Sequence, residues 1–378
     1  MRDPEDATTL CRFCPKLCRH ACPVADAEQS ERATPWGKMT AMKMVEENKL
    51  PMDRETMGLA YKCLNCRASE KACELGNPVS QTLDTFRVRA FRAGLTPDGV
   101  EEHCDRFRRH NNPYDKDLLK ILERKFPNQT KSRPPGGLFG GLRTAYFPGC
   151  TEIVKSPSTI AKTLSLLEGV SLYAEPIQCC GYPLFAAGDW EGFVELAEVN
   201  SHSLRDYDRI LTGAPACLYT METLYRSAGH GVGTQFQHVV EYLAAALGSA
   251  APLRGRKKGG PGRLKVAYHD PCYLGRYRKI YQEPRALIRQ KNGEPPIEFL
   301  RHGEDSACCG AGGLLPVSFP ETAAKVTESR VEEFKRTGAD LLVTSCPTCV
   351  QRFRKFGVAA QSLVDFLTDT EPGNDLSK

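Results

Sequence analysis

The residues of this chain best suited to chemistry are its cysteines, of which there are 17 among 378 residues. Sixteen fall in four groups, and only Cys104 stands apart, where we expect a half-buried thiol on a helix. A disulfide scaffold is typical of small secreted domains, whereas thiols in a reducing compartment more often bind metal. The cysteine pattern therefore favours soft metal chemistry, with iron and zinc as the candidates.

Two of the groups lie near the N-terminus, in the runs CRFCPKLCRHACP and CLNCRASEKAC. Thiolates so spaced wrap a compact anionic inorganic core, and in two-cluster ferredoxins the last cysteine of each run binds the other cluster. The pattern therefore predicts two [4Fe-4S] sites. The expected ligands are Cys11, Cys14, Cys18 and Cys73 for one site, and Cys22, Cys63 and Cys66 for the other.

Both runs depart from the ferredoxin pattern. Three residues instead of two separate Cys14 from Cys18, and Ser69 stands where the second run should have its third cysteine. Four alternatives remain for the second site. Ser69 could supply an alkoxide ligand, Cys73 could bind the cluster of its own run, or the site could hold a three-iron cluster or no cluster. Zinc is the rival in each run, but four cysteines followed by Pro23 favour iron–sulfur. Both runs also contain basic side chains. Cations beside a cluster raise its reduction potential, and the alternative is that these side chains form a solvated face. The basic residues are Arg12, Lys16, Arg19, His20, Arg67 and Lys71.

The second half of the chain contains one unit of about 120 residues twice, which outweighs any single motif. RTAYFPGC matches LKVAYHDPC, QCCGYPL matches ACCGAGGL, RILTGAPAC matches LLVTSCPTC, and QHVVEYLAAAL matches QSLVDFLTDT. Each unit reads as strand, cysteine, helix, short strand, CCG, long helix, strand, and a helix opened by Pro-x-Cys. Strands alternating with helical stretches predict a parallel sheet with helical crossovers.

In such a sheet the loops after the strands gather at one edge, so cysteines far apart in sequence can converge there. Two adjacent cysteines can face one site only where the backbone turns sharply, which Gly181 and Gly310 permit. We expect Ser345 to cap the following helix and Pro347 to lie in its first turn. The second unit would then join five thiols, one more than a tetrahedral zinc site uses: Cys272, Cys308, Cys309, Cys346 and Cys349.

The first unit has four cysteines, because Ala214 occupies the place of Cys346. We expect a metal there, either zinc or a further cluster, with a decayed site kept for packing as the alternative. The four are Cys150, Cys179, Cys180 and Cys217.

Other function classes find little support. The net charge of +5 is mild, and the run RGRKKGGPGR is expected to be a solvated linker rather than a nucleic-acid patch. The most apolar stretch, HVVEYLAAALGSAAP, is too short to span a membrane and predicts a short helix. The N-terminus lacks the features of a signal peptide, so we expect a cytoplasmic protein. GAGGLLP lies behind the CCG pair and does not match a nucleotide fingerprint, so we expect no flavin in this chain.

The ferredoxin-like runs followed by two Cys…CCG…CxxC units resemble the cysteine-rich iron–sulfur proteins of the heterodisulfide reductase type. That group includes the iron–sulfur subunits of glycolate oxidase and anaerobic glycerol-3-phosphate dehydrogenase. The resemblance covers nearly the whole chain, and the gaps of 35 residues from Cys272 to Cys308 and 36 from Cys309 to Cys346 agree with the family signature.

The resemblance implies a noncubane [4Fe-4S] cluster on the five cysteines of the second unit. It also implies an electron-transfer subunit between a flavoprotein dehydrogenase and a quinone, cytochrome or disulfide acceptor, held on the inner membrane face only through a partner. One alternative is an enzyme that cleaves a disulfide at this cluster, and another is a zinc scaffold without redox activity. His269 and Asp270 could tune or protonate a group there, but a structural turn with backbone bonds is the favoured interpretation.

The expected fold is α/β, with an α-helical ferredoxin-like two-cluster domain followed by two repeated α/β cysteine-rich domains. The predicted divisions are a ferredoxin-like domain at 1–95, a helical connector and linker at 96–142, a first cysteine-rich domain at 143–250, a basic linker at 251–263 and a second cysteine-rich domain at 264–378.

Overall fold

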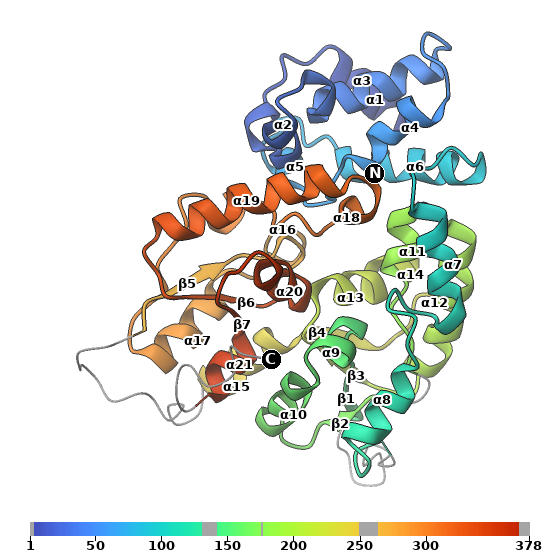
Figure 1. The fold of residues 1–378 in the computed structure, drawn as a ribbon. Coiled ribbons are helices and arrows are strands. Elements are labelled where there is room, and N and C mark those ends of the chain that lie inside the picture. Colours follow the sequence, from blue (N-terminus) through green and yellow to red (C-terminus); the bar gives the residue numbers. More distant parts are fainter. Residues whose placement is uncertain (1–3, 131–141, 175–176, 249–263, 370–378) are drawn as a thin grey trace.

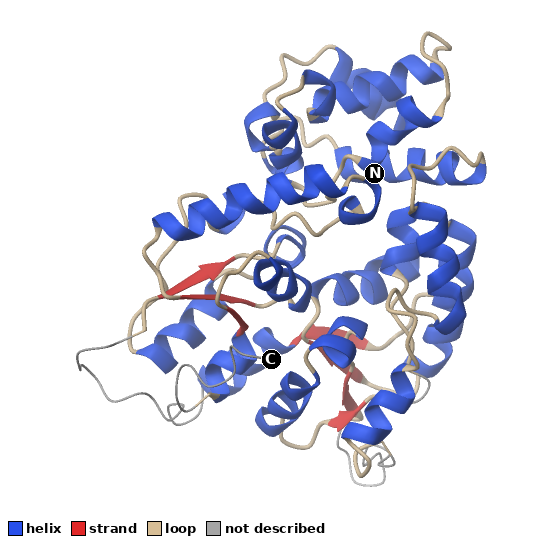
Figure 2. Ribbon diagram, in the orientation of Figure 1, coloured by secondary structure: helices blue, strands red, loops and turns tan. Residues whose placement is uncertain are grey.

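The computed structural model describes residues 4–130, 142–174, 177–248 and 264–369 (Figure 1). The protein is a mixed α/β structure in which helices predominate over two small sheets, as Figure 2 shows. This agrees with the expected α/β class. The predicted basic linker at 251–263 lies outside the described residues, as does the end of the predicted connector at 131–141.

The N-terminal part is entirely helical over its described residues. Its helices are α1 (Pro4–Arg12), η1 (Arg19–Ala21), α2 (Pro23–Glu28), η2 (Glu31–Ala33), α3 (Pro35–Glu46), α4 (Arg54–Tyr61), α5 (Ala68–Lys71), α6 (Val79–Arg92), α7 (Val100–His110) and α8 (Leu118–Lys125). Short polar caps begin two of them, since Thr34 accepts a hydrogen bond from the Gly37 amide (2.9 Å) and Asp53 from that of Thr56 (2.8 Å). Helix α1 packs on α3 and α4 on α6. The first cysteine run begins in α1 and ends at the N-terminus of α2, and the second run flanks α5 (Figure 1).

The first repeat contains a four-stranded parallel sheet of order β2-β1-β3-β4. Its elements are β1 (Thr144–Tyr146), α9 (Cys150–Lys155), α10 (Pro157–Leu166), β2 (Ser171–Leu172), α11 (Tyr182–Ala187), α12 (Trp190–Leu204), β3 (Arg209–Thr212), α13 (Pro215–Tyr219), η3 (Thr220–Leu224), α14 (Tyr225–Ser227), β4 (Gln235–His238) and α15 (Val239–Gly248). The apolar stretch that begins at His238 therefore forms the predicted short helix.

The second repeat has the parallel order β5-β6-β7, and an isolated parallel bridge between Ala267 and Ile297 stands where the first repeat has β2. Its elements are β5 (Val266–His269), α16 (Cys272–Arg278), α17 (Gln282–Asn292), η4 (Gly303–Asp305), α18 (Leu315–Ser318), α19 (Pro320–Arg336), β6 (Leu341–Thr344), α20 (Pro347–Lys355), β7 (Ala360–Ser362) and α21 (Leu363–Thr368). The shared strand order confirms the repeat and its parallel crossovers.

The two repeats pack against each other through equivalent helices. Helix α10 contacts α21 while its counterpart α17 contacts α15, and α9 contacts α20 while its counterpart α16 contacts α13. Each repeat thus presents the same surface to the other, as the subunits of a twofold dimer do. No helix among the described residues is long and apolar enough to cross a lipid bilayer.

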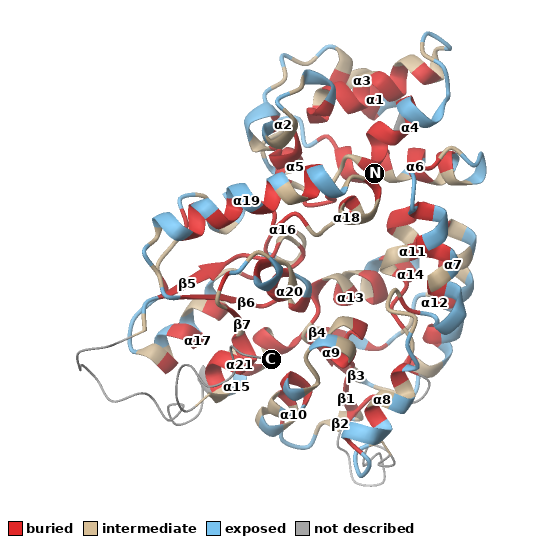
Figure 3. Cartoon of the chain, viewed as in Figure 1, coloured by how far each residue is buried: buried red, intermediate tan, exposed pale blue. Residues whose placement is uncertain are grey.

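Buried residues follow the strands and the inner faces of the helices (Figure 3). Arg87 of α6 is fully buried, so its charged guanidinium needs hydrogen-bond acceptors inside the protein. Its guanidinium donates to the carbonyl oxygens of Ala60 (3.1 Å), Cys63 (2.6 Å) and Ala186 (3.1 Å). This single side chain therefore ties the N-terminal helices to the second cysteine run and to the first repeat.

One sequence expectation about the helix ends is wrong. Ser345 is not the N-cap of α20; Cys346 is, in an extended conformation, while Pro347 occupies the first turn as predicted. The residue before a proline is driven away from the helical region, so the helix cannot include Cys346. The Ser345 hydroxyl instead accepts a hydrogen bond from Tyr268 (3.1 Å).

Candidate metal centres

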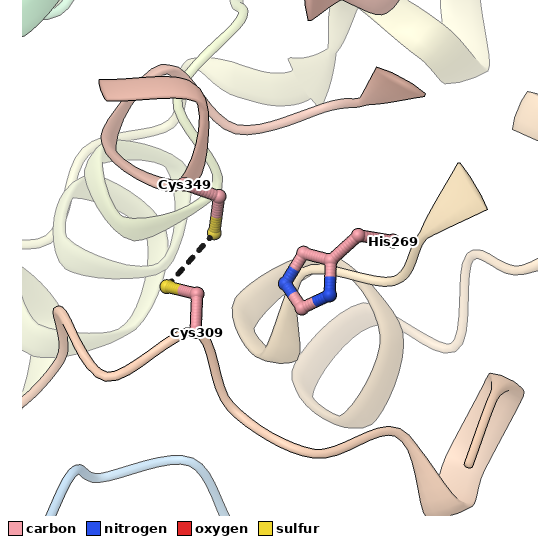
Figure 4. Close-up of side chains that lie close together, drawn as sticks. All are labelled: His269, Cys309 and Cys349. Atoms are coloured by element: carbon pink, nitrogen blue, oxygen red, sulfur yellow. Dashed lines mark hydrogen bonds between the residues drawn. The ribbon is translucent and has the colours of Figure 1, made fainter. Parts of the chain in front are cut away.

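The five cysteines of the second repeat converge at the carboxyl edge of its sheet, from the start of α16, the loop after η4 and the start of α20. Their sulfurs form one continuous series of contacts: Cys272 with Cys308, Cys308 with Cys309, Cys309 with Cys349 at 3.4 Å, and Cys349 with Cys346. Figure 4 shows the Cys309 and Cys349 sulfurs facing each other beside His269. The three members of the set with the least exposure, Cys308, Cys309 and Cys349, are each 5% exposed or less.

The glycine that follows the cysteine pair is required by the turn. Gly310 has a φ of 88°, and Gly181 in the first repeat has 86°, as the sequence predicts. A Cβ on Gly310 would lie 2.5 Å from Oγ1 of Thr327 and 2.8 Å from the carbonyl oxygen of Ala323. Thr327 in turn donates to the carbonyl oxygen of Cys309 (2.9 Å), so α19 clamps the turn that exposes both sulfurs to one site.

The surroundings of this site suit an anionic guest. The neighbouring sulfurs of Cys308 and Cys349 hold the pKa of Cys309 well below its usual range. The guanidinium of Arg276 lies near Cys272 and Cys308, and that of Arg352 lies near Cys308 and Cys309. In each arginine Nη2 is buried and has no hydrogen-bond acceptor among the described residues. Five sulfurs with spare buried donors fit an iron–sulfur cluster, whose inorganic sulfides accept hydrogen bonds.

The first repeat joins its four cysteines in the same way, with Cys150 and Cys179 sulfurs 3.6 Å apart and contacts continuing to Cys180 and Cys217. Ala214 caps α13 at the place that Cys346 has at α20, so no fifth sulfur is present. The acidic neighbour of Cys217 is Glu152, whose pKa burial raises to about 7 and to which Tyr146 donates at 2.9 Å. The two repeats therefore differ in charge as well as in ligand number.

In the N-terminal part Cys11, Cys14, Cys18 and Cys73 come together. Burial raises the pKa of Cys11 to about 12, and the neighbouring thiols of Cys18, Cys73 and Cys14 add to the rise. The side-chain amide of Asn77 donates to the Cys11 sulfur (2.9 Å), and its backbone amide to that of Cys73 (3.5 Å). Sequence reasoning missed Asn77, because a lone asparagine outside the cysteine runs gives no signal.

The remaining cysteines, Cys22, Cys63 and Cys66, line one small cavity together with Ser69. The ammonium of Lys38, 2% exposed, lies 3.8 Å from the Cys22 sulfur. Burial raises the pKa of Cys63 to about 11. The spacing of the two runs predicted this grouping, including the exchange of Cys22 and Cys73 between them, whereas Lys38 was not predicted.

This second N-terminal group lies against the second repeat. The neighbouring Cys308 sulfur is the main cause that lowers the pKa of Cys66 to about 6. Arg276 spans the junction, donating to the carbonyl oxygens of Cys66 (2.5 Å) and Ser306 (2.7 Å). A Cβ on Gly313 would lie 2.1 Å from the carbonyl oxygen of Cys63, so the glycine-rich GAGG loop serves close packing.

The cations within the cysteine runs do not contact the sulfurs as a group. Arg12 pairs with Glu47 (2.7 Å), and Lys16 and Arg19 both pair with Glu31. Lys71 pairs with Asp305 (2.6 Å), while the Arg67 guanidinium stacks 3.8 Å above the Tyr277 ring. The solvated-face interpretation therefore describes most of them, and the cations beside sulfurs come from elsewhere in the chain.

His269 and Asp270 only partly follow the expected structural turn. Asp270 accepts from the Gly303 amide (2.8 Å) but also forms a bidentate ion pair with Arg285. The His269 ring is buried and lies beside the sulfurs of Cys309 and Cys349 and the guanidinium of Arg330, and burial lowers its pKa. Cys104 lies on α7 as predicted but is fully buried, with burial raising its pKa to about 12.

Comparison with known proteins identifies similarity over most of the chain. Residues 144–222 and 266–354 each match the cysteine-rich domain family CCG. The chain is 27% identical to a subunit of the CoM/CoB fumarate reductase of Methanothermobacter marburgensis over 88% of its own length and 65% of that relative. It is 26% identical to a subunit of the dihydromethanophenazine:CoB–CoM heterodisulfide reductase of Methanosarcina barkeri, over 76% of this chain and 71% of the relative.

A third relative is a probable membrane-anchored ferredoxin of Chromohalobacter salexigens, 32% identical over 79% of this chain and 44% of the relative. The chain thus covers 44% to 71% of the length of these three curated relatives. Among solved structures, a putative Asp/Glu racemase from Yersinia pestis matches with a TM-score of 0.26 at 13% identity, over 59% of this chain and 95% of that structure, which is too low to bear on the fold.

Proposed function

Residues 144–222 and 266–354 are two cysteine-rich domains of the CCG family, and we propose that the chain that carries them is an iron–sulfur electron-transfer subunit of an oxidoreductase complex. Its relatives include named subunits of fumarate and heterodisulfide reductases, which supports a role in which this chain works with other subunits. The proposed sites are two ferredoxin-type sites in the N-terminal part and a noncubane [4Fe-4S] site on the five cysteines of the second repeat.

The observation that carries the proposal is that three cysteine groups are in series. Cys18 neighbours both Cys73 of the first group and Cys22 of the second, and Cys66 of the second group contacts Cys308 of the second repeat. Proteins that transfer electrons through several centres place them in such a row, because tunnelling falls off steeply with distance. The fourth group, in the first repeat, lies off this row and is proposed to hold zinc or a further cluster.

Iron–sulfur clusters bound at these sites would supply one-electron oxidation and reduction. The chain's own residues hold the thiolates, exclude water and balance charge. Lys38 and Arg276 place buried positive charge beside the second group and the junction, which favours a negatively charged guest there. Arg276 also fixes the distance between the groups, because its hydrogen bonds to Cys66 and Ser306 belong to both.

The proposed partners follow from this arrangement. A flavoprotein dehydrogenase subunit would exchange electrons at the outer N-terminal group, and a quinone, cytochrome or disulfide acceptor would be served from the second repeat, or the reverse. Any contact with a membrane would then come through a partner subunit. The chain would itself be a disulfide reductase if a small disulfide were turned over at the second repeat.

Anaerobic purification followed by iron, zinc and sulfide determination tests the proposal. We expect about 8 to 12 iron atoms per chain from two or three clusters outside the first repeat, and about four more if the first repeat also holds a cluster, with EPR signals in the reduced or oxidised state. Cys14→Ser and Cys309→Ser should each remove a different signal. Cys104→Ala should remove none, because the charged neighbours of Cys104 among the described residues are Asp189, Arg108, Asp105 and Glu101 rather than cysteines. Colourless protein that contains zinc but no iron would refute the proposal.

A further inference from the structure

Besides its fifth cysteine, the second repeat has a buried histidine, His269, beside its sulfurs. Its ring is 1% exposed and lies at the end of β5, edge-on to Phe353 at 5.0 Å and to Phe299 at 6.1 Å. One ring nitrogen lies within 4.8 Å of the sulfurs of Cys309 and Cys349, and Figure 4 shows that nitrogen pointing at them. A buried imidazole at that place needs a partner for each of its two nitrogens.

We propose that His269 donates a hydrogen bond from Nε2 to the Cys309 thiolate and thereby raises the reduction potential of the cluster in the second repeat, with Arg330 as the residue that positions it. The proposal deepens the function proposed above and rests on it. His269 acts here as a hydrogen-bond donor to a ligand and not as a ligand of iron.

The orientation of the ring follows from Arg330. Both Nε and Nη2 of Arg330 lie 3.4 Å from Nδ1 of His269. A guanidinium can only donate, so Nδ1 must offer its lone pair and the ring proton must be on Nε2. Nε2 is the nitrogen on the side of the sulfurs, and it lies within 4.8 Å of the Cys309 sulfur. Arg330 therefore selects the tautomer that can donate to sulfur.

Arg330 is itself held rigidly. It is 1% exposed, its Nη1 donates to Glu333 at 2.5 Å, and its Nη2 donates to the Ser306 hydroxyl at 3.2 Å. Its guanidinium also stacks 3.9 Å from the centre of the Phe299 ring. These three contacts leave the side chain of Arg330 little freedom to turn away from His269.

The first repeat provides an internal comparison. Aligned on the strand and the following cysteine, Phe147 stands where the second repeat has His269. Phe147 packs against Tyr173, with ring centres 5.4 Å apart, and offers no donor to a sulfur. The histidine therefore accompanies the complete set of five cysteines and is absent at the incomplete set, although the same fold accommodates an aromatic ring there.

A hydrogen bond to a cluster thiolate stabilises the more reduced state, because that state carries more negative charge on sulfur. A hydrogen bond to a charged group contributes more than one between neutral groups. We therefore expect His269→Phe to lower the ratio of reduced to oxidised cluster by roughly tenfold at a fixed potential, which is about 59 mV for a one-electron couple.

The test is an EPR-monitored redox titration of the full chain, purified anaerobically, as wild type, His269→Phe and His269→Gln. The glutamine keeps a donor and should recover part of the potential that phenylalanine loses. The N-terminal clusters of the same molecules are the control and should keep their potentials. Histidine labelled with ¹⁵N should give a weak coupling to the cluster in pulsed EPR, which His269→Phe removes.

Three results would overturn the inference: an unchanged potential in His269→Phe, no recovery in His269→Gln, or a strong ¹⁵N coupling that marks direct ligation. Iron content and thermal unfolding of each variant separate these results from misfolding, which Phe147 in the first repeat argues against. Wild-type protein without a cluster in the second repeat would overturn the proposed function itself. That outcome differs from the three above, which overturn only the role of His269.

Discussion

Ser69 differs from the cysteine expected at its place by a single atom, and that atom decides what the second N-terminal group can bind. The residue is 8% exposed and shares a cavity with Cys22, Cys63 and Cys66, so its side chain is positioned where a fourth thiolate would be. A hydroxyl is a poorer ligand than a thiolate for soft iron–sulfur chemistry. The group as it stands is therefore one good ligand short of a cubane site.

We expect Ser69→Cys to increase the iron content by up to about one atom per chain and to strengthen the EPR signal of a four-iron cluster, because the thiolate completes the set of four. Iron determination and EPR of the reduced protein provide the check. Ser318→Cys is a matched control, since Ser318 is also 8% exposed but lies away from this cavity. Equal iron in both variants would contradict the expectation.

Ala214 and Cys346 allow a reciprocal exchange between the repeats, because each residue caps the equivalent helix. Cys346→Ala should remove the noncubane signal and about four iron atoms, leaving a site like that of the first repeat. Ala214→Cys should increase the metal content of the first repeat, because it adds the missing fifth thiol. Parallel iron and zinc counts on the two variants test this; a Cys346→Ala protein with unchanged EPR would show that four cysteines suffice.

At the level of elements, the turns that present the cysteine pairs depend on backbone conformation as much as on sulfur. Gly310 combines a positive φ with contacts to α19 that leave no room for a Cβ. Gly338, after the same helix, also has a positive φ of 66°, but a Cβ there would meet nothing within 4 Å. Alanine at Gly338 would introduce backbone strain alone, whereas alanine at Gly310 would add a steric collision to that strain.

We expect Gly338→Ala to lower the free energy of unfolding by about 1 kcal/mol, from strain alone. Gly310→Ala should lower it by about 2 kcal/mol more, because Ala323 and Thr327 must move, and should also reduce iron binding in the second repeat. Chemical denaturation and iron determination on both variants measure this. Similar losses in the two would mean that α19 yields easily and does not clamp the turn.

Helix α7 contains a histidine that makes stability depend on pH. Burial lowers the pKa of His103 to about 4, and its Nε2 has no hydrogen-bond partner among the described residues. The unfolded chain, with an ordinary histidine pKa near 6.5, binds the proton more readily between these two values. Stability should therefore rise as pH increases through this window and fall by about 2 kcal/mol from pH 7 to pH 5.

His103→Leu should flatten this dependence by that amount, as unfolding at pH 5 and pH 7 would reveal. The exposed His202 is the control, and His202→Leu should leave the slope unchanged. The buried His238 has a similarly lowered pKa and should maintain a remaining slope in the His103→Leu protein. A slope that is the same in wild type and His103→Leu would contradict the assignment.

At the scale of the whole molecule, the N-terminal helices and the two repeats form one assembly around the cysteine groups. Arg87 joins carbonyl groups of α4, the second cysteine run and α11, and Tyr61 adds a hydrogen bond from its hydroxyl to Ala187 (2.8 Å). The distance between the N-terminal groups and the second repeat depends on these contacts, since they hold the loop of Cys63 and Cys66 in place.

Arg87→Met should lower the free energy of unfolding by about 3 kcal/mol, because three buried carbonyls lose their donor and Asp84 loses its counter-charge. Arg89→Met is the matched control; Arg89 is 43% exposed and lies 3.9 Å from Glu46, so its loss should cost less than about 0.5 kcal/mol. Denaturant unfolding of the two variants gives the comparison. Equal stabilities would mean that the buried guanidinium contributes little net energy.

The cysteine groups, the repeat and the parallel direction of its strands were readable from the sequence alone, since these depend on local spacing and on the periodicity of strands and helices. The positive φ at Gly181 and Gly310 and the grouping of Cys73 with the first run follow from the same local rules. Ser345 failed as a cap because the neighbouring Pro347 constrains the residue before it, a competition between two local preferences.

Only the tertiary structure decided which groups meet. The contact between Cys66 and Cys308, the placement of Lys38 and Arg276 beside sulfurs, and the pairing of Arg330 with His269 join residues from different helices and strands. Such contacts depend on how whole elements pack, and a lone lysine, arginine or histidine outside a motif has no local pattern that indicates its partner. The sequence therefore determined which ligands the chain offers, and the packing determined in which order they lie.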